Sequence, residues 1–161
     1  MTKLRTARLT LAPLAEADAD FVLELLNDPG WIRHIGDRGV RSLNDARAYI
    51  RDRCSASLWL VARDAAGERL GMCGLVEREG LDSPDLGYAF LQRHCGQGYA
   101  TEVAAAVLAH VREALRPAKL AAIVDPENRA SRRVLEKIGF RYVDTRDLGE
   151  LGVSAYYLAT A

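Results

Sequence analysis

Apolar and polar residues alternate along this chain in two rhythms, and each rhythm predicts one kind of secondary structure. A period of two is typical of a half-buried strand, whereas apolar side chains three or four residues apart form one face of a helix. In the first third of the chain the rhythms predict a strand at 8–11, a helix from about 16 to 27, an irregular segment at 31–39 and a helix from about 43 to 50. Asp28-Pro29 is expected to end the first helix, and Ser42 with Asp45 resembles a capping box at the start of the second.

The remainder of the chain predicts a sheet that is interrupted by one long helix. In order, the pattern predicts strands at 58–63, 69–78 and 85–91, an amphipathic helix at 98–115, a strand at 119–124, a helix at 131–138 and strands at 140–145 and 153–160. The long helix can return the chain to the edge at which it left the sheet, so the strands at 85–91 and 119–124 should be parallel neighbours. Because no repeat or linker interrupts residues 1–161, we expect a single α/β (α+β) domain with a mostly antiparallel mixed sheet.

Composition and charge restrict the classes of protein and partner. The chain has 161 residues, of which 49% are hydrophobic and 27% charged, as in an ordinary globular domain. Basic and acidic residues both number 22, and this balance predicts no nucleic-acid partner. Three cysteines without a Cys-x-x-Cys pair favour neither a disulfide framework nor a zinc site, so we expect no metal and a cytoplasmic location. No apolar run approaches the roughly 18 residues of a spanning helix, so no membrane association is expected.

The most informative stretch lies between the strand at 85–91 and the long helix, where Gly96 and Gly98 precede the first helical turn. Glycine permits a positive φ and a close approach of the backbone, and the free amides of a helix start attract anions. The stretch therefore predicts a phosphate site, although a bare Gly-x-Gly also occurs in tight turns. No lysine follows as in a Walker loop, and Thr101 replaces the third glycine of a dinucleotide fingerprint. Asp125 follows the next strand as a ribose-binding acid would, so the dinucleotide alternative stays open.

Two motifs follow one another in the second half of the chain. The first motif reads Arg93-x-x-Gly96-x-Gly98-Tyr99-Ala100-Thr101-Glu102. The second motif reads Asn128-x-x-Ser131-Arg132-Arg133-Val134-Leu135-Glu136-Lys137-Ile138-Gly139-Phe140. Together they resemble the GNAT acetyltransferases, most closely the branch that contains the ribosomal-protein N-terminal (alanine) acetyltransferases, and the resemblance covers nearly the whole chain. It implies a GNAT fold whose two central parallel strands splay apart between flanking helices, and transfer of an acetyl group from acetyl-CoA to a primary amine.

The resemblance also implies which residues bind the cofactor. The pantetheine arm is expected between the splayed strands, where Phe90 and Leu91 would offer backbone groups. Arg93 would add positive charge at the pyrophosphate. The main-chain amides implied for the pyrophosphate are those of Gly96, Gln97, Gly98, Tyr99 and Ala100. Asn128 would reach the pantetheine or, as asparagine often does, cap the following helix.

Attack of an amine on a thioester requires a neutral amine, a stabilised oxyanion and a thiolate that can leave. The candidate bases are Glu77 and Asp85, although both are also typical of exposed strand ends. We favour Glu77, because Asp85 begins its strand and is expected to face water. A main-chain amide near Leu91 could meet the oxyanion. Many relatives carry a tyrosine, as the general acid, where this chain has Leu135. Ser131 matches the serine of the ribosomal branch and would either hydrogen-bond the sulfur or only cap the helix.

The acceptor is the least defined part of the site. Trp31 and His34 are expected to line its pocket, or else to belong to a small hydrophobic cluster under a loop. The acceptor would be a protein N-terminus or a small-molecule amine, and the chain would act as a monomer or a homodimer. Because Leu135 replaces the tyrosine and the base is uncertain, a non-catalytic sensor that binds acyl-CoA is the competing hypothesis.

Overall fold

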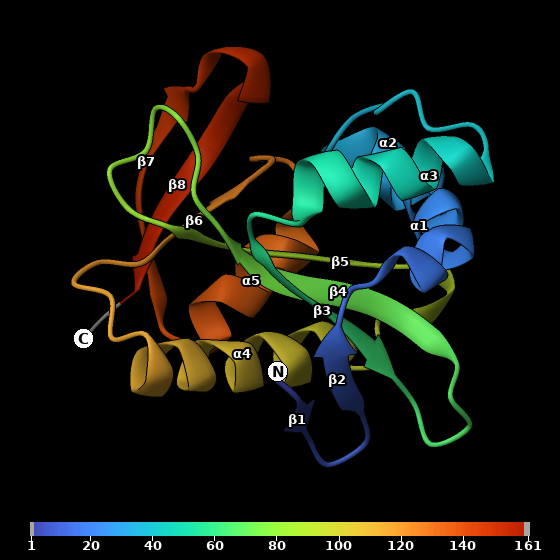
Figure 1. The fold of residues 1–161 in the computed structure, drawn as a ribbon. Helices are drawn as coiled ribbons and strands as arrows, with labels where there is room; N and C mark the ends of the chain where they lie inside the picture. Colours follow the sequence, from blue (N-terminus) through green and yellow to red (C-terminus); the bar gives the residue numbers. More distant parts are fainter. Residues whose placement is uncertain (1, 160–161) are drawn as a thin grey trace.

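Eight strands form one mixed sheet in the computed structural model, which describes residues 2–159 (Figure 1). In chain order they are β1 (Leu4–Arg5), β2 (Thr10–Pro13), β3 (Leu58–Arg63), β4 (Arg69–Val76), β5 (Asp85–Phe90), β6 (Ala121–Val124), β7 (Phe140–Asp147) and β8 (Val153–Ala159). Their order in the sheet is β1-β2-β3-β4-β5-β6-β8-β7. Only β5 and β6 are parallel, and every other neighbouring pair is antiparallel. The predicted mostly antiparallel sheet with a parallel central pair is confirmed.

Helices cover both faces of this sheet. One face carries α1 (Ala19–Leu26), α2 (Pro29–His34) and α3 (Leu43–Tyr49), with single turns η1 (Glu16–Asp18) before α1 and η2 (Ile50–Cys54) after α3. The opposite face carries α4 (Tyr99–Ala114) and α5 (Arg129–Lys137), while the turns η3 (Gln92–His94) and η4 (Gly149–Leu151) lie in connections. The apolar stripe predicted for the long helix is buried against the sheet, at Val103, Ala104, Val107, Leu108 and Val111.

The expectation of an irregular segment at 31–39 is wrong in its first part, because α2 begins at Pro29. Asp28 caps this helix by accepting a hydrogen bond from the Gly30 amide at 3.1 Å, and proline is well suited to a first helical position. The Asp28-Pro29 pair thus both ends α1 and starts α2.

The capping box predicted at the start of α3 is half present. The Ser42 hydroxyl accepts the Asp45 amide at 3.0 Å, but the Asp45 carboxylate accepts the Arg41 amide rather than that of Ser42.

The parallel pair β5–β6 separates almost as soon as it forms. Within residues 2–159 the two strands are in register only at Asp85 and Ala121, where the Ala121 amide also donates to the Pro84 carbonyl at 2.9 Å. β6 pairs on its other side with β8 along its whole length, from Ala121 to Val124. The sheet therefore splits between β5 and β6 toward their carboxyl ends, as the resemblance implied.

Candidate functional site

The split leaves one backbone edge of β5 without a neighbouring strand. The Leu91 amide donates to the Leu70 carbonyl on the β4 side at 3.0 Å. Because the hydrogen-bonding direction of the backbone alternates along a strand, Ala89 faces β4 as Leu91 does, and Tyr88 and Phe90 face the split. An extended ligand could pair with this edge as an added strand does. The expectation for Leu91 is corrected here, because its amide is bonded to Leu70 and its carbonyl accepts the His94 amide at 2.9 Å.

The glycine-rich turn stands at the end of this edge and carries free donors. Gly96 has a φ of +81° and Gly98 a φ of +82°, in the left-handed region that favours glycine. A Cβ atom placed on Gly96 would meet nothing within 4 Å. Gly98 is the N-cap of α4 and has no side chain to cap it, and no group in residues 2–159 accepts the amides of residues 96–101. The turn therefore offers an anion several amides and the positive end of a 16-residue helix.

Arg8 lies against this turn, although no local pattern marked it. Its Nη1 donates to the Gln97 carbonyl at 2.9 Å, and its Nε pairs with Glu102 Oε1 at 2.7 Å. The guanidinium also stacks over the Tyr99 ring at 4.2 Å. Burial works to raise the pKa of Glu102, but hydrogen bonds from Thr6 and Arg8 outweigh it and lower that pKa. The β1–β2 hairpin is thereby fastened to the first turn of α4.

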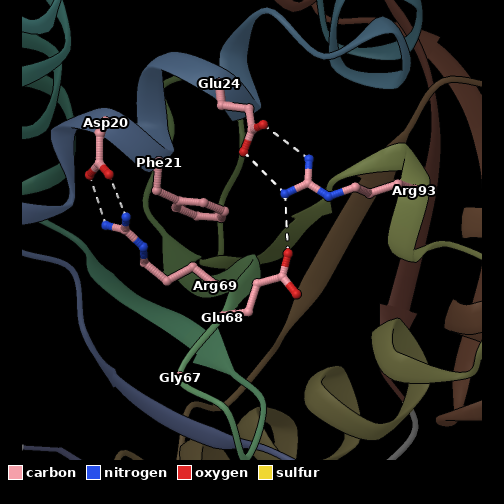
Figure 2. Close-up of a pocket in the computed structure, with 7 residues that line it drawn as sticks. All are labelled: Asp20, Phe21, Glu24, Gly67, Glu68, Arg69 and Arg93. Carbon is pink, nitrogen blue, oxygen red and sulfur yellow. Dashed lines mark hydrogen bonds and ion pairs between the residues drawn. The ribbon is translucent and has the colours of Figure 1, made fainter.

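Arg93 points away from the turn, in contrast to its expected role. Its Nη1 pairs with Glu24 on α1 at 3.0 Å, and its Nη2 pairs with Glu68 at 3.4 Å. Figure 2 shows these pairs on one side of a shallow hollow, and the pair of Asp20 with Arg69 on the other side. The hollow has a volume of about 400 Å³. The charges around the hollow are paired with one another. The guanidinium that touches the turn is that of Arg8.

Helix α2 spans the open end of the split. At its start the Asp28 carboxylate accepts the amide of Gln92, which follows β5, at 3.2 Å. At its end His34 Nδ1 lies 2.7 Å from Asp125 Oδ2, just after β6. Burial opposes ionisation of Asp125, but hydrogen bonds from His34 and from a main-chain amide outweigh it and lower its pKa. Asp125, the candidate ribose ligand of the dinucleotide alternative, is therefore already paired.

The two residues expected to line the acceptor pocket both lie on α2. Trp31 is only 7% exposed and packs in the hydrophobic cluster beneath α1–α3. Its indole Nε1 is buried and has no hydrogen-bond partner within residues 2–159. His34 faces Asp125 across the end of the split. The structure thus places Trp31 in the core and His34 at the edge where β5 and β6 diverge.

The two candidate bases have opposite surroundings, and those of Asp85 differ from the expectation. Asp85 is 1% exposed and pairs with Arg78 Nε at 2.9 Å, so the expectation that it faces water is wrong. Burial raises the pKa of Asp85 by more than Arg78 lowers it. Glu77 lies one residue beyond the end of β4 and is exposed. Asp85 is buried because it is the residue at which β5 still pairs with both β4 and β6.

The second motif forms α5, and a serine hydroxyl in its first turn meets a tyrosine hydroxyl of β5. Asn128 Oδ1 accepts the Ser131 amide at 3.1 Å, so Asn128 caps this helix. The Ser131 hydroxyl lies 2.8 Å from the Tyr88 hydroxyl of β5. Leu135, one turn further along α5, is 1% exposed and belongs to the core.

Residues 8–141 match the family model described as an acetyltransferase (GNAT) domain. The chain belongs to the GNAT acetyltransferase family. It is 35% identical over 153 residues to the uncharacterized protein YkkB of Bacillus subtilis, a match that covers 89% of this chain and 88% of YkkB. GNAT enzymes use acetyl-CoA, and this chain is an acetyl-CoA-dependent acyltransferase.

Solved structures of GNAT acetyltransferases share the fold. The ribosomal α-N-protein acetyltransferase RimL, in complex with coenzyme A, superimposes with a TM-score of 0.83 at 15% identity over 98% of this chain and 97% of RimL. The spermidine N-acetyltransferase of Vibrio cholerae, in complex with CoA and spermine, gives a TM-score of 0.79 at 19% identity over 94% of this chain and 95% of that one. The predicted fold class and the resemblance to the GNAT family are confirmed.

The residues of this GNAT chain fit coenzyme A. The unpaired edge of β5 suits the amides of pantetheine, and the free amides at the start of α4 suit a pyrophosphate.

In the described range, 2–159, no three ligating side chains are grouped as a metal site would require. No helix within that range is both long and apolar enough to cross a membrane.

Proposed function

We propose that this acetyltransferase moves the acetyl group of acetyl-CoA directly onto a primary amine of a protein N-terminus or a small molecule. The observation that carries the proposal is the split between β5 and β6, with the free amides of the glycine turn at its end. An extended thioester ligand needs a strand edge for its arm and an anion site for its phosphates. The unpaired edge of β5 provides the first, and the glycine turn that follows it provides the second. Asp125, the candidate ribose ligand of a dinucleotide, pairs with His34, which disfavours that alternative.

The proposed cofactor site uses backbone more than side chains. Phe90 presents its main chain to the pantetheine arm, and Asn128 and Ser131 approach from α5. The pyrophosphate is bound by the main-chain amides of Gly96, Gln97, Gly98, Tyr99 and Ala100. Arg8 supplies the positive charge that the motif had suggested for Arg93. Acetyl-CoA, when bound, supplies the activated acyl group.

We propose Asp85 as the base that takes the proton of the attacking amine through an intervening water, because it lies buried at the closed end of the split. A base is most effective when its pKa lies near the working pH, and burial moves the pKa of Asp85 in that direction. An α-amine titrates near 7.7–8.0 and a lysine near 10.4, so an N-terminus needs the less powerful base. His34 forms the α2 side of the acceptor site in this proposal, and Trp31 anchors that helix from the core. Protein N-termini and polyamines are the two acceptor classes that the named neighbours suggest.

The experiment that tests the function is a screen for thiol release from acetyl-CoA. Peptides with free N-termini, polyamines, aminoglycosides and amino acids are supplied in turn, and mass spectrometry detects the acetylated product. We expect rapid thiol release with at least one class and an acetyl group on its amine. A chain that binds CoA tightly and yet acetylates no member of any class would support the competing hypothesis of a non-catalytic sensor.

The role of Arg8 gives a prediction about affinity. Arg8→Ala should weaken CoA binding about tenfold, since charge-assisted hydrogen bonds at the turn are lost and the turn is no longer braced. Arg93→Ala is the matched control and should stay within about twofold of the wild type, because Arg93 pairs with Glu24 and Glu68. Isothermal calorimetry measures both. A large loss for Arg93→Ala beside a normal Arg8→Ala would reverse the assignment.

A further inference from the structure

Two hydroxyl groups from different elements meet beside the split. The Tyr88 hydroxyl, from β5, donates to the main-chain carbonyl of Ser131 at 2.9 Å and lies 2.8 Å from the Ser131 hydroxyl. The Tyr88 ring packs partly buried against the core between the sheet and α4–α5. Residues 88 and 131 are 43 positions apart, so no local motif announces the contact.

Ser131 is held in place from two directions. Its amide is fixed by Asn128 at the start of α5, and its hydroxyl is fixed by Tyr88. Position 135 lies on the same face of α5, one turn later, but carries a buried leucine and no donor. The Ser131 hydroxyl is therefore the donor that α5 retains on this face, next to the strand whose backbone edge is unpaired at Tyr88 and Phe90.

We propose that Tyr88 is a positioning residue that directs the Ser131 hydroxyl to the sulfur of coenzyme A. The inference rests on the proposed function. As the amine nitrogen forms its bond to the acetyl carbon, the carbon–sulfur bond breaks and its electron pair passes to sulfur. Ser131 donates a hydrogen bond to that thiolate, while the single proton of the Tyr88 hydroxyl turns from the Ser131 carbonyl to the Ser131 hydroxyl oxygen and strengthens the donor. The proton of the amine leaves to the base, and the thiolate takes a proton from water.

The protonation state of Tyr88 suits this arrangement. Burial is the main cause that raises the pKa of the Tyr88 phenol, well above its usual range, and its hydrogen bond to Ser131 offsets only part of that shift. The phenol therefore remains a neutral donor across the pH range in which a thiol ionises. Tyr88 therefore adds no titration of its own to the pH dependence of binding at the sulfur.

The test compares binding of CoA with binding of desulfo-CoA, which lacks the sulfur, by calorimetry between pH 6 and pH 9.5. In the wild type we expect CoA to gain about tenfold over desulfo-CoA as the thiol ionises, because a charged acceptor strengthens the hydrogen bond from Ser131. Tyr88→Phe and Ser131→Ala should each lose most of this gain, read as the ratio of CoA affinity to desulfo-CoA affinity within each variant. The double variant should lose no more than either single one, and Ser131→Thr, which keeps a hydroxyl, should retain part of the gain.

Tyr142→Phe is the matched control, since Tyr142 lies on β7 and its hydroxyl contacts Thr145. It should keep the full gain. A Tyr88→Phe variant that also keeps the full gain, or that weakens CoA and desulfo-CoA equally at every pH, would overturn the role of Tyr88. Wild type that binds CoA without any gain over desulfo-CoA would overturn this inference alone, whereas wild type that binds neither compound would overturn the proposed function.

Discussion

Gly98→Trp should weaken CoA binding by about 100-fold or more and leave a folded protein. Gly98 has a φ of +82° and precedes the first turn of α4, where the free amides lie. A Cβ atom there would stand 3.4 Å from the Arg8 guanidinium, so an indole would displace that group and cover the amides. The left-handed conformation costs a non-glycine residue about 1–2 kcal/mol, which lowers the melting temperature by only a few degrees.

Gly67→Trp separates backbone strain from steric block. Gly67 has a φ of +84°, and a Cβ atom there would meet nothing within 4 Å. It lies in the turn between β3 and β4, at the hollow around Arg93 and away from the free amides of the glycine turn. Both variants should therefore melt at similar temperatures, and only Gly98→Trp should fail in a calorimetric titration with CoA. Normal CoA binding by Gly98→Trp would remove the basis for placing the pyrophosphate at this turn.

Asp85→Asn should lower kcat/KM for the true acceptor by about 10²–10⁴, the range for loss of a positioned base. The substitution keeps the size of a side chain that is 1% exposed and removes its charge. Glu77→Gln is the matched control and should remain near wild type, because Glu77 is exposed beyond the end of β4. Steady-state rates as a function of pH measure both. Collapse of Glu77→Gln beside an active Asp85→Asn would return the role to Glu77, and two active variants would mean that water takes the proton.

Thermal melting gives an independent check on Asp85. Its folded pKa is raised, mainly by burial, so the folded state favours the protonated form. The contribution of Asp85 to stability is therefore fully present below the ordinary pKa of an aspartate and is lost as pH rises through the raised pKa. Asp85→Asn should remove that part of the pH dependence and should melt no lower than wild type at pH 7. A marked fall in the melting temperature at pH 7 would show that the ion pair with Arg78 outweighs the cost of burial.

Local signals predicted most of the fold. The change from period two to a helical stripe placed α4, and its length predicted the parallel return to β6. The same signals misjudged α2, because Asp28-Pro29 is typical both of a helix end and of a helix start. Whether a second helix follows the pair depends on the packing of Trp31 against α1–α3, a tertiary contact that the local pattern does not contain.

The candidate site was predictable where backbone chemistry determines it, at Gly96 and Gly98. Side-chain roles were harder to predict, because they depend on partners far away in the chain. Arg8 and Glu102 are 94 residues apart, and Arg93 finds its partner Glu24 across 69 residues. The burial of Asp85 likewise follows from its place between two strands rather than from its neighbours in sequence.

Amide hydrogen exchange of the full chain, measured with and without CoA, tests most directly whether the cofactor lies along β5 and the start of α4. Exchange should slow at Tyr88 and Phe90, which face the split, and at residues 96–100 in the glycine turn. No group in residues 2–159 accepts the amides of residues 96–100. The Leu91 amide, already bonded to Leu70, should change little. Saturating CoA that leaves the amides of residues 96–100 unchanged, and protects the hollow around Arg93 instead, would contradict this site.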